Sequence, residues 1–479
     1  MKKPRWTLLR FTLILAILLA AMSVTALASG APEADAEYET ASGWETGSIA
    51  DAFSKVKDGG SIKLLGDVTL SENLTLSETK SVTLLGEGCK LSVTSIILSG
   101  SFKLTLGAED YDKTLVISSH SDTQCIISCD SDTVLTMYDN VTLGPSRAGG
   151  QTGGVHLSDR AVFYMYGGRI TECENWASIS GAISLANESV FYMYDGLIDN
   201  CTGVRGGAIS VTPQFPIGGS SVGPASVNIY GGTIKNCSDT TSGGAIRINS
   251  SYDVTINISG LSIIDCSTTG YGGAIYVNLS NKDAKVNISD TEITGCSADQ
   301  YGGGIFLYHG DLALGSDVSV HNNSAKLAGD DLYFHATVPS SFYDPPSGLT
   351  LSTTGRDIEG WHVDGLTVGE STPRWTLGGE DVEPYIMPIA AQEVEPGTAL
   401  KAAHGDKVSY TIEVSVNDPD YGTAYADLTS AEAGTTISLT ATPNDGYSFA
   451  GWQVVSGGIQ ITDNKFIMPC LLYTSDAAD

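Results

Sequence analysis

Five cysteines stand at the same place in a repeated sequence pattern, and the thiol is the most reactive group that this chain repeats. Each follows an isoleucine by three residues, and the five are Cys173, Cys201, Cys237, Cys266 and Cys296. In the next repeat Val320 and Asn323 occupy the two places. Thiols in a regular column could act as small buried hydrophobes, form disulfides or bind a metal ion.

The geometry expected of such a column favours free thiols. Equivalent residues of neighbouring parallel strands lie about 4.8 Å apart, which is within reach of a disulfide. Parallel strands in register, however, point their Cβ atoms the same way, so the disulfide torsion of about 90° is hard to reach. The sequence also contains no Cys-x-x-Cys spacing. We predict a structural ladder of buried free thiols and no metal site, with disulfides between some cysteines or a metal ion as the alternatives.

The residue before each of these cysteines is suited to a tight corner. It is Glu172, Asn200, Asn236, Asp265 or Gly295. Asn, Asp and Gly adopt the left-handed backbone conformation at the lowest cost. We therefore expect a turn in front of each cysteine.

Tyrosines recur at two further positions of the same pattern and are the candidate ligand-binding residues. One row contains Tyr166, Tyr194 and Tyr230, and the neighbouring row contains Tyr164 and Tyr192. In later repeats serine continues the first row, and asparagine continues the second. Stacked tyrosines could bind sugar rings or a partner protein. The alternative is that like residues stack only because stacking stabilises a sheet.

Carboxylates are numerous, but their pattern does not predict a catalytic centre. The candidates are Asp195, Asp199, Asp253, Asp265, Asp290, Asp330 and Asp331. A glycan-cleaving enzyme needs clustered carboxylates, together with a basic group that stabilises developing charge. His309 and Lys326 are isolated, and no His or Arg recurs beside the aspartates. We predict no catalytic residue and no cofactor, and keep a polysaccharide lyase or glycoside hydrolase as the alternative.

The repeat that carries these residues predicts the fold. Glycine followed by glycine or alanine and then an apolar residue recurs at intervals of roughly 30 residues, which indicates stacked units. The motifs are Gly154-Val155, Gly181-Ala182-Ile183, Gly207-Ala208-Ile209, Gly244-Ala245-Ile246, Gly273-Ala274-Ile275, Gly303-Gly304-Ile305 and, in a degraded form without the glycine, Asp331-Leu332. Apolar residues also alternate with polar ones, as in Ile256 and Ile258 around Asn257, which is the period of a strand with one buried face. We predict an all-β parallel β-helix.

These repeats resemble those of right-handed parallel β-helix proteins of the pectin-lyase-like superfamily. They look most like surface adhesins and polymorphic membrane proteins, in which a Gly-Gly-apolar motif is paired with an aromatic-x-x-Asn motif. Here Ile-x-x-Cys stands in the second place, and only Val320 to Asn323 recovers the asparagine. The resemblance covers residues 61–334 and implies a right-handed coil. The Asn-Thr-Asp, Gly-His-Gly and Arg-Ile-Lys motifs of the polygalacturonases are absent.

The N-terminal region contains three expected segments. Basic residues, an apolar run and Ala26-Leu27-Ala28 predict a secretory signal peptide over residues 1–28. Residues 29–43 are predicted to be a disordered lead-in, because they are acidic and rich in small residues. Helical spacing of the apolar residues Ile49, Ala52, Phe53 and Val56 predicts a short helix that caps the β-helix. We expect the capped β-helix to cover residues 44–337.

After the repeats we expect a linker and small β spacer over 338–403 and an antiparallel β domain over 404–469. The motif Gly446-Tyr447-Ser448-Phe449-Ala450-Gly451-Trp452 and the final Met468-Pro469 resemble the internalin-type B-repeats of bacterial surface proteins. Residues 470–479 neither alternate nor contain an anchor motif, and we expect a truncated or non-native tail there.

Charge and composition narrow the class of function. The formal net charge is −30, so binding to nucleic acid or to anionic lipid is not expected. No stretch after the signal peptide is long and apolar enough to span a bilayer, so insertion of the mature chain into a membrane is not expected either. We predict a secreted or cell-surface bacterial protein that acts without catalysis, in adhesion or in binding an unidentified glycan or surface protein. A purely structural stalk is a further alternative.

Overall fold

The computed structural model describes most of two compact units, which contain residues 34–404 and 409–467. In the first unit it describes 34–335 without 151, 178, 213–222, 253, 282 and 316, and short strands between 348 and 404. In the second unit it omits 433–435, 455–460 and 463. The predicted signal peptide and the predicted tail 470–479 lie outside the described residues. No described helix is long and apolar enough to cross a membrane.

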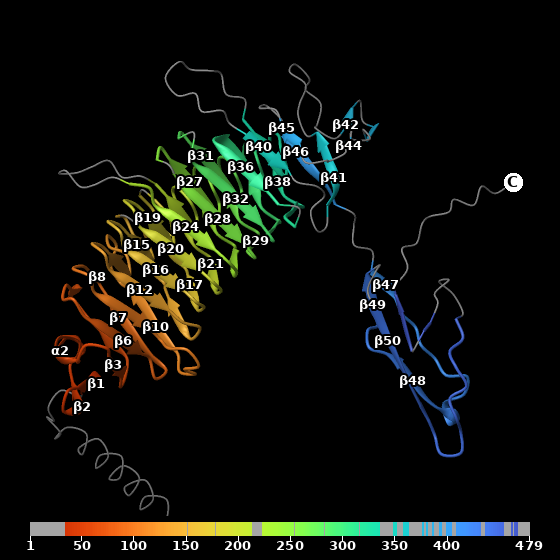
Figure 1. Ribbon diagram of the computed structural model, residues 1–479, viewed down its shortest axis with the longest axis horizontal. Helices are drawn as coiled ribbons and strands as arrows, with labels where there is room; N and C mark the ends of the chain where they lie inside the picture. The colour runs from red at the N-terminus through yellow and green to blue at the C-terminus, as the bar shows by residue number, and fades with distance from the viewer. Residues whose placement is uncertain are drawn as a thin grey trace, which may run out of the picture. The chain divides into compact units, whose positions relative to one another are not determined.

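The first unit is a solenoid whose strands form four sheets, named here sheets A to D. Each coil contributes one strand to most of these sheets, and each strand pairs in parallel with the equivalent strand of the next coil (Figure 1). The prediction of an all-β parallel solenoid is confirmed.

Sheet A has 14 strands. In spatial order these are β2 (Gly43–Gly47), β1 (Ala36–Thr40), β3 (Gly60–Leu64), β6 (Ser81–Leu85), β9 (Lys103–Leu106), β12 (Val134–Met137), β16 (Val162–Met165), β20 (Val190–Met193), β24 (Ser226–Ile229), β28 (Thr255–Ser259), β32 (Lys285–Ser289), β36 (Asp311–Leu314), β40 (Gly348–Leu351) and β45 (Gln392–Val394).

Sheet B has ten strands and sheet D has seven. Sheet B contains β4 (Val68–Thr69), β7 (Cys89–Val93), β10 (Leu115–Ser119), β13 (Val141–Leu143), β17 (Arg169–Thr171), β21 (Leu197–Asp199), β25 (Thr233–Lys235), β29 (Ser262–Ile264), β33 (Glu292–Thr294) and β37 (Ser319–His321). Sheet D contains β14 (Ser146–Ala148), β18 (Cys173–Asn175), β22 (Thr202–Gly203), β26 (Ser238–Asp239), β30 (Ser267–Thr268), β34 (Ser297–Ala298) and β38 (Ser324–Ala325).

Sheet C has 13 strands. They are β5 (Leu74–Leu76), β8 (Ile96–Leu98), β11 (Ile127–Cys129), β15 (Val155–Leu157), β19 (Ile183–Leu185), β23 (Ile209–Val211), β27 (Ile246–Ser250), β31 (Ile275–Leu279), β35 (Ile305–His309), β39 (Leu332–Phe334), β46 (Ala399–His404), β41 (Ile358–Val363) and β44 (Ile386–Met387). A separate two-stranded ribbon joins β42 (Thr376–Leu377) and β43 (Glu380–Asp381).

The recurring glycine pair is explained by the corner that leads into sheet C. The first glycine has a positive φ, for example +78° at Gly243, which glycine adopts without strain. The second lies against the next coil, because a Cβ on Gly244 would be 2.1 Å from the carbonyl oxygen of Gly273. Gly207 and Gly273 have the same close approach, at 2.0 and 2.1 Å from the next coil. The motif therefore fixes how closely the coils stack.

The N-terminal end is covered by a hairpin and a helix. The predicted cap is confirmed as α2 (Ile49–Lys55), which buries Ile49, Ala52 and Phe53 and has Ser48 as its N-cap. The prediction of disorder over 29–43 is wrong for β1, which pairs antiparallel with β2 and β3. The alternation of β1 buries Ala36 and Tyr38, and this outweighs its acidic composition.

The C-terminal end extends further than the sequence suggested. β40 adds to sheet A in parallel, with Leu312 opposite Leu349, although the β-helix was expected to end at residue 337. β45 and β46 then pair antiparallel with β40 and β39. The strands β40, β41, β44, β45 and β46 therefore extend sheets A and C of the solenoid, where a separate spacer was predicted, and β42 and β43 form a ribbon of their own.

The second unit is a small antiparallel β domain, as predicted. β47 (Ser409–Thr411) pairs with β49 (Ser430–Glu432), while β50 (Thr436–Pro443) lies between β48 (Gly422–Ala426) and β51 (Lys465–Ile467). A 3-10 turn covers Pro419–Tyr421. The small core of this domain contains Ala431, Ile437, Leu439 and Phe466.

Candidate functional site

Sheet A brings the predicted tyrosines together on its outer surface. Tyr164 of β16 lies opposite Tyr192 of β20 in the parallel register. Tyr166 and Tyr194 directly follow the same two strands, and Tyr230 follows β24. Each of these three donates its backbone N–H to the methionine carbonyl that ends the preceding strand, at 2.7–2.9 Å. The backbone ladder therefore fixes the spacing of the rings.

A fourth tyrosine, Tyr138, begins this row and was not predicted. We name Tyr138, Tyr166, Tyr194 and Tyr230 the tyrosine row. Its successive ring centroids lie 5.3, 4.9 and 5.3 Å apart, and the ring planes differ by 8° to 25°. The segment Val134–Tyr138 has the same pattern as Val162–Tyr166, with Thr136 in place of a tyrosine, so a comparison of the two segments could have found it.

The stacked arrangement determines which parts of the rings are available. Inside the row both faces of each ring are directed at its neighbours, so ring edges and hydroxyl groups point toward solvent. Tyr166, Tyr194 and Tyr230 remain 42, 40 and 50 % exposed. At the two ends, Tyr138 and Tyr230 each stack with one ring of the row among the described residues. A ligand along the row would meet hydroxyl groups, which both donate and accept hydrogen bonds.

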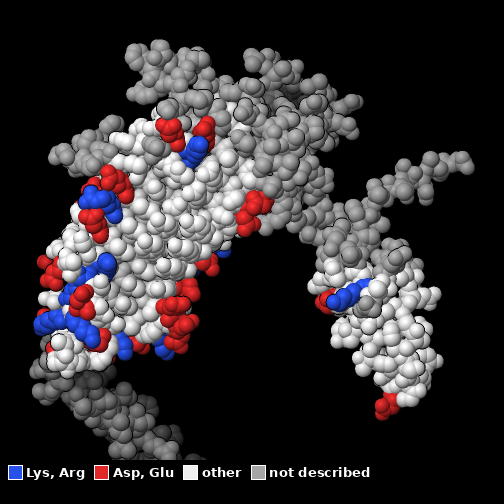
Figure 2. Space-filling model, in the orientation of Figure 1, with Lys and Arg blue, Asp and Glu red and all other residues white. Residues whose placement is uncertain are grey.

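Three valines extend this surface and were also missed. Val134, Val162 and Val190 are partly exposed and in register at the start of β12, β16 and β20. We name these valines, Tyr164, Tyr192 and the tyrosine row together the aromatic face. Figure 2 shows this side of the solenoid as an almost uncharged expanse with charged groups gathered along its rims. An exposed apolar surface of this kind marks an interaction site more often than a scattered residue does.

Toward the C-terminal end the aromatic face gives way to an asparagine ladder. Asn257 donates to the side-chain oxygen of Asn228 at 3.1 Å, and Asn287 donates to that of Asn257 at 3.0 Å. These residues continue the column of Tyr164 and Tyr192. The face is therefore limited to a few coils and is not a general property of sheet A.

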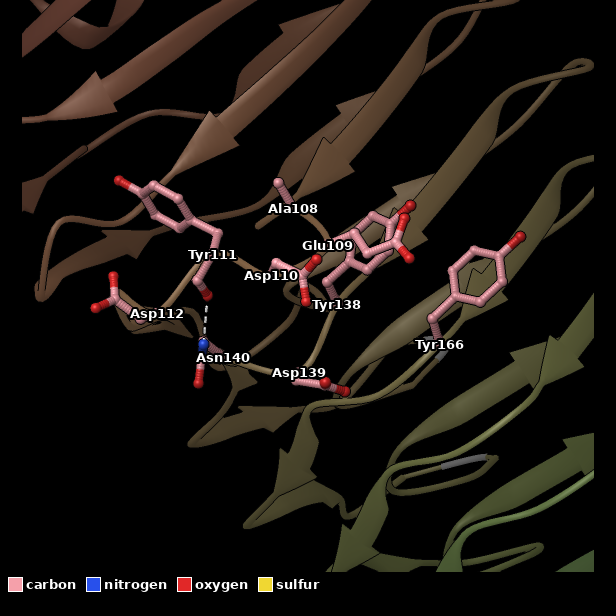
Figure 3. A pocket seen from close by; sticks show the side chains of 9 residues that line it. All are labelled: Ala108, Glu109, Asp110, Tyr111, Asp112, Tyr138, Asp139, Asn140 and Tyr166. Carbon is pink, nitrogen blue, oxygen red and sulfur yellow. Dashed lines mark hydrogen bonds between the residues drawn. The ribbon is translucent and has the colours of Figure 1, made fainter.

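An acidic hollow of about 700 Å³ lies at the Tyr138 end of the tyrosine row. Its lining residues are Ala108, Glu109, Asp110, Tyr111, Asp112, Tyr138, Asp139, Asn140 and Tyr166 (Figure 3). Asn140 donates its side-chain N–H to the carbonyl oxygen of Tyr111 and so ties the two sides together. Tyr111 itself donates its hydroxyl to Glu87. Burial and this carboxylate raise the pKa of Tyr111.

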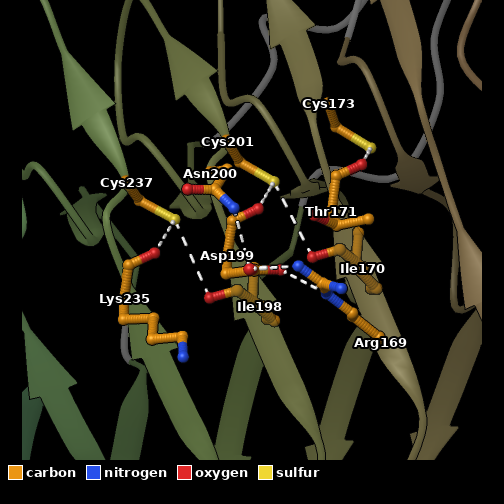
Figure 4. A network of polar contacts seen from close by, with 10 residues as sticks. All are labelled: Arg169, Ile170, Thr171, Cys173, Ile198, Asp199, Asn200, Cys201, Lys235 and Cys237. Carbon is orange, nitrogen blue, oxygen red and sulfur yellow. Dashed lines mark hydrogen bonds and ion pairs between the residues drawn. The ribbon is translucent and has the colours of Figure 1, made fainter.

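The five predicted cysteines lie inside the solenoid at the start of the sheet D strands or directly before them. All five have an exposed fraction of 0 %. From Cys201 onward each sulfur lies 3.9–4.0 Å from the carbonyl oxygen of the isoleucine that precedes the previous cysteine (Figure 4). Each also lies 3.3–3.5 Å from the carbonyl two residues earlier in its own coil. Burial raises the pKa of Cys201 and Cys266 well above the usual thiol value.

Asn323 shows what this position does. Its side-chain N–H donates to the carbonyl oxygen of Ile293 at 3.0 Å, which is the bond that a cysteine sulfur makes in the other coils. The column therefore satisfies a buried carbonyl on each preceding coil. The predicted turns are confirmed, since Glu172, Asn200, Asn236, Asp265 and Gly295 all have φ between 52° and 69°.

The candidate carboxylates occupy separate structural positions. Asp199 is held by Arg169 at 2.7 Å; burial would raise its pKa, but hydrogen bonds from Arg169 and Thr171 keep it below the usual value. Asp265 and Asp290 are in left-handed turns, Asp195 accepts from the following backbone N–H, and Asp253 lies outside the described residues. Among the described residues no group of three or more His, Cys, Asp or Glu could hold a metal ion.

The last pair of aspartates binds backbone groups at the C-terminal end of the solenoid. Asp331 is 1 % exposed and accepts from the backbone and side chain of Asn323 and from the backbone N–H of Ala402, at 3.1, 2.8 and 2.7 Å. Burial raises its pKa to about 7. Asp330 accepts from the backbone N–H of Ala325. These contacts fasten β46 to the final coil.

A second aromatic cluster, which the sequence analysis missed, lies on sheet C. Its rings are Tyr271, Tyr276, Tyr301, Phe306, Tyr308, Tyr333 and His335. Phe306 is 2 % exposed, and burial raises the pKa of Tyr276 to about 12. This cluster is more enclosed than the aromatic face.

Comparison with known proteins concerns the second unit. The family model of the divergent InlB B-repeat domain matches residues 412–477. No curated protein and no solved structure matches the chain. The chain therefore combines a β-solenoid with a domain similar to InlB B-repeats, which is the composition of a surface-type repeat protein.

Proposed function

We propose that this chain is a secreted or cell-surface bacterial protein that binds a glycan on its aromatic face and has no catalytic centre. The observation that carries the proposal is the tyrosine row, whose members remain 40–50 % exposed from Tyr166 to Tyr230 although they stack. Partner proteins at the cell surface are the other class of ligand that such a surface could bind. Adhesion through the solenoid would suit the B-repeat-like domain, since B-repeats are typical of surface proteins.

The aromatic face suits a linear polyol. Successive tyrosine hydroxyls repeat with each coil, and ring centroids are 4.9–5.3 Å apart along the row. A chain of sugar residues laid along the row could bond to several hydroxyls at once. Its C–H groups would meet the tyrosine edges and the valines. Each contact is weak, so affinity would depend on several coils acting together.

The contacts of three carboxylates that the sequence suggested as catalytic candidates support a non-catalytic function. Asp199 is engaged by Arg169, and Asp330 and Asp331 bind backbone N–H groups of the solenoid. A lyase or hydrolase would need an acid and a base free to reach the substrate. Incubation with polygalacturonate, pectin, alginate and hyaluronan plus calcium should therefore yield neither new reducing ends nor unsaturated products. Turnover that Asp331→Asn abolishes would support the enzyme instead.

The binding experiment compares two triple variants on a panel of neutral, acidic and amino-sugar oligosaccharides. Tyr166, Tyr194 and Tyr230 are changed together to Ser in one variant. The control changes Tyr421, Tyr425 and Tyr447, which are 48, 57 and 51 % exposed in the second unit, to Ser. Loss of three central contacts should weaken binding by about tenfold or more in the first variant.

The outcome must also separate binding from stability. Aromatic pairs contribute about 0.5–1.5 kcal/mol each beyond area burial, so the first variant should melt below the wild type but remain folded at the temperature of the binding assay. A large loss of stability with unchanged binding would show that the row is structural. Equal loss of binding in both variants would show that the loss is not specific to the tyrosine row and would contradict the proposal.

A further inference from the structure

Among the residues that the structure describes, Tyr138 stacks with Tyr166, and no other ring is recorded on the face that points away from the tyrosine row. Tyr138 donates its backbone N–H to the carbonyl oxygen of Leu106 in the preceding coil. The residue of that coil that occupies the position of Tyr138 is therefore Gly107. A Cβ on Gly107 would be 3.5 Å from the Cβ of Tyr138, but glycine has no side chain to place there. Tyr138 lines the acidic hollow together with Glu109 and Asp139 (Figure 3).

The charged side chains that line the hollow are all acidic. Glu109, Asp110, Asp112 and Asp139 contribute carboxylates to its lining, and no Lys or Arg lines it. None of the four forms an ion pair with a residue that the structure describes. Some exposed carboxylates elsewhere on the solenoid are paired, as Asp132 is with Arg160 at 2.7 Å. The hollow thus offers an aromatic ring face with uncompensated negative charge beside it.

We propose that the ligand of the aromatic face is an amino-sugar polymer with free, protonated amines. This inference rests on the function proposed above. One ammonium group lies against the open face of Tyr138, where the ring quadrupole attracts a cation. The surrounding carboxylates add charge complementarity, and the remaining sugars extend along the tyrosine row. Acidic glycans are repelled by the same carboxylates, and neutral or acetylated ones lack the cationic anchor.

A basic peptide carries the same cationic groups, but the fold favours a glycan. Peptides commonly bind to β proteins by adding a strand to a free sheet edge. The strands that carry the aromatic face, β12, β16, β20 and β24, each pair with a neighbour on both sides, and the edge strands of sheet A, β2 and β45, lie several coils away. What remains is the outer surface with its repeated hydroxyls, which has no main-chain groups to pair with a peptide.

Two oligosaccharides that differ only in amine charge test the proposal. Glucosamine oligomers and fully N-acetylated oligomers of the same length are titrated calorimetrically into the full chain at low salt. The glucosamine oligomer should bind about tenfold or more tightly than its acetylated counterpart. Its affinity should fall several-fold as salt rises, because screening weakens exposed charge interactions. Equal affinity for the two oligomers would overturn the proposal.

Charge-removing variants test whether the ammonium group of the ligand binds at the acidic hollow. The hollow variant carries Glu109→Gln, Asp110→Asn and Asp139→Asn, and its control carries Glu72→Gln, Asp122→Asn and Asp445→Asn, which remove the same charge at other exposed positions. The hollow variant should bind the glucosamine oligomer about tenfold more weakly and the control should not. Tyr138→Leu should weaken binding of the glucosamine oligomer by about twofold to fivefold, which corresponds to the loss of one exposed cation–π contact. Equal losses in hollow and control variants would overturn the proposal.

The remaining outcomes separate this inference from the proposed function. Binding of oligolysine without binding of the glucosamine oligomer would assign the hollow to a basic protein and overturn the glycan assignment. A neutral glycan that requires Tyr166, Tyr194 and Tyr230 but ignores the hollow variant would leave the proposed function standing and overturn this inference. Glucosamine binding that neither the hollow variant nor the tyrosine variant reduces would overturn both.

Discussion

Replacing Gly244 with alanine should disrupt the stacking of the solenoid more than its small size suggests. The new Cβ would lie 2.1 Å from the carbonyl oxygen of Gly273 and 2.6 Å from that of Ser267, and both are backbone atoms that cannot rotate away. The coil would have to separate from its neighbour locally. The N–H of Gly244 bonds to Gly272 at 3.0 Å, and that bond would be strained or lost.

The magnitude follows from these two effects. Forcing an extra carbon into a packed interior costs about 1–3 kcal/mol. Losing one or two buried coil-to-coil hydrogen bonds costs about 1 kcal/mol each. We expect Gly244→Ala to lower the free energy of unfolding by about 2–5 kcal/mol in urea denaturation followed by circular dichroism. Hydrogen exchange should accelerate mainly in the adjoining coils, because each coil contacts only its neighbours.

Gly66 provides the matched control. It lacks a positive φ, and a Cβ there would meet nothing within 4 Å. Gly66→Ala should leave stability unchanged or raise it by less than about 1 kcal/mol. If Gly244→Ala behaved like Gly66→Ala, the close approach of the coils at the glycine pair would be refuted.

Four further predictions concern groups inside and on the solenoid. Denatured, unreduced protein should titrate with as many thiols as the reduced sample, and a deficit would reveal disulfides. Burial lowers the pKa of His156 to about 4, so the free energy of unfolding should fall by about 3 kcal/mol as pH drops from 6.5 to 4, and His156→Asn should flatten this dependence. Burial raises the pKa of Asp331 to about 7, so the C-terminal coils should instead lose protection from hydrogen exchange as pH rises from about 4 to 7, and a flat profile would contradict this. Asn257→Ala should cost about 1–2 kcal/mol in urea denaturation, since it removes two ladder hydrogen bonds, and no loss would show that the ladder contributes nothing.

The solenoid was predictable because its sequence repeats the physical constraints of one coil many times. The alternation around Asn257 gives the buried face of a strand, and the pair Gly243-Gly244 gives the corner. The position of Tyr166 relative to Tyr194 follows from the same register. A single coil would not have been convincing, but the same offsets occur in successive coils.

Strands that do not belong to the repeat were not predicted from the sequence. The strand Ala36–Thr40 occurs once, and its carboxylates concealed the alternation that buries Tyr38. The strands β40 and β46 pair across segments of unrelated sequence, so no local pattern indicates their partners.

The candidate site was predicted only in part for a similar reason. Tyr164, Tyr166, Tyr192, Tyr194 and Tyr230 were found from their spacing. Tyr138 was not, because Thr136 breaks the resemblance of its strand to the next two. The acidic hollow depends on loop residues 108–112 and on the absence of a side chain at Gly107, and neither has a periodic signal.

Oxidative footprinting of tyrosine side chains, read by mass spectrometry, tests ligand binding on the aromatic face most directly. The full chain is labelled with and without the tightest-binding oligosaccharide of the panel. The account predicts that bound ligand protects Tyr166, Tyr194 and Tyr230, while Tyr421, Tyr425 and Tyr447 of the second unit are oxidised as before. Protection confined to the second unit, or unchanged labelling of the tyrosine row at saturating ligand, would contradict it.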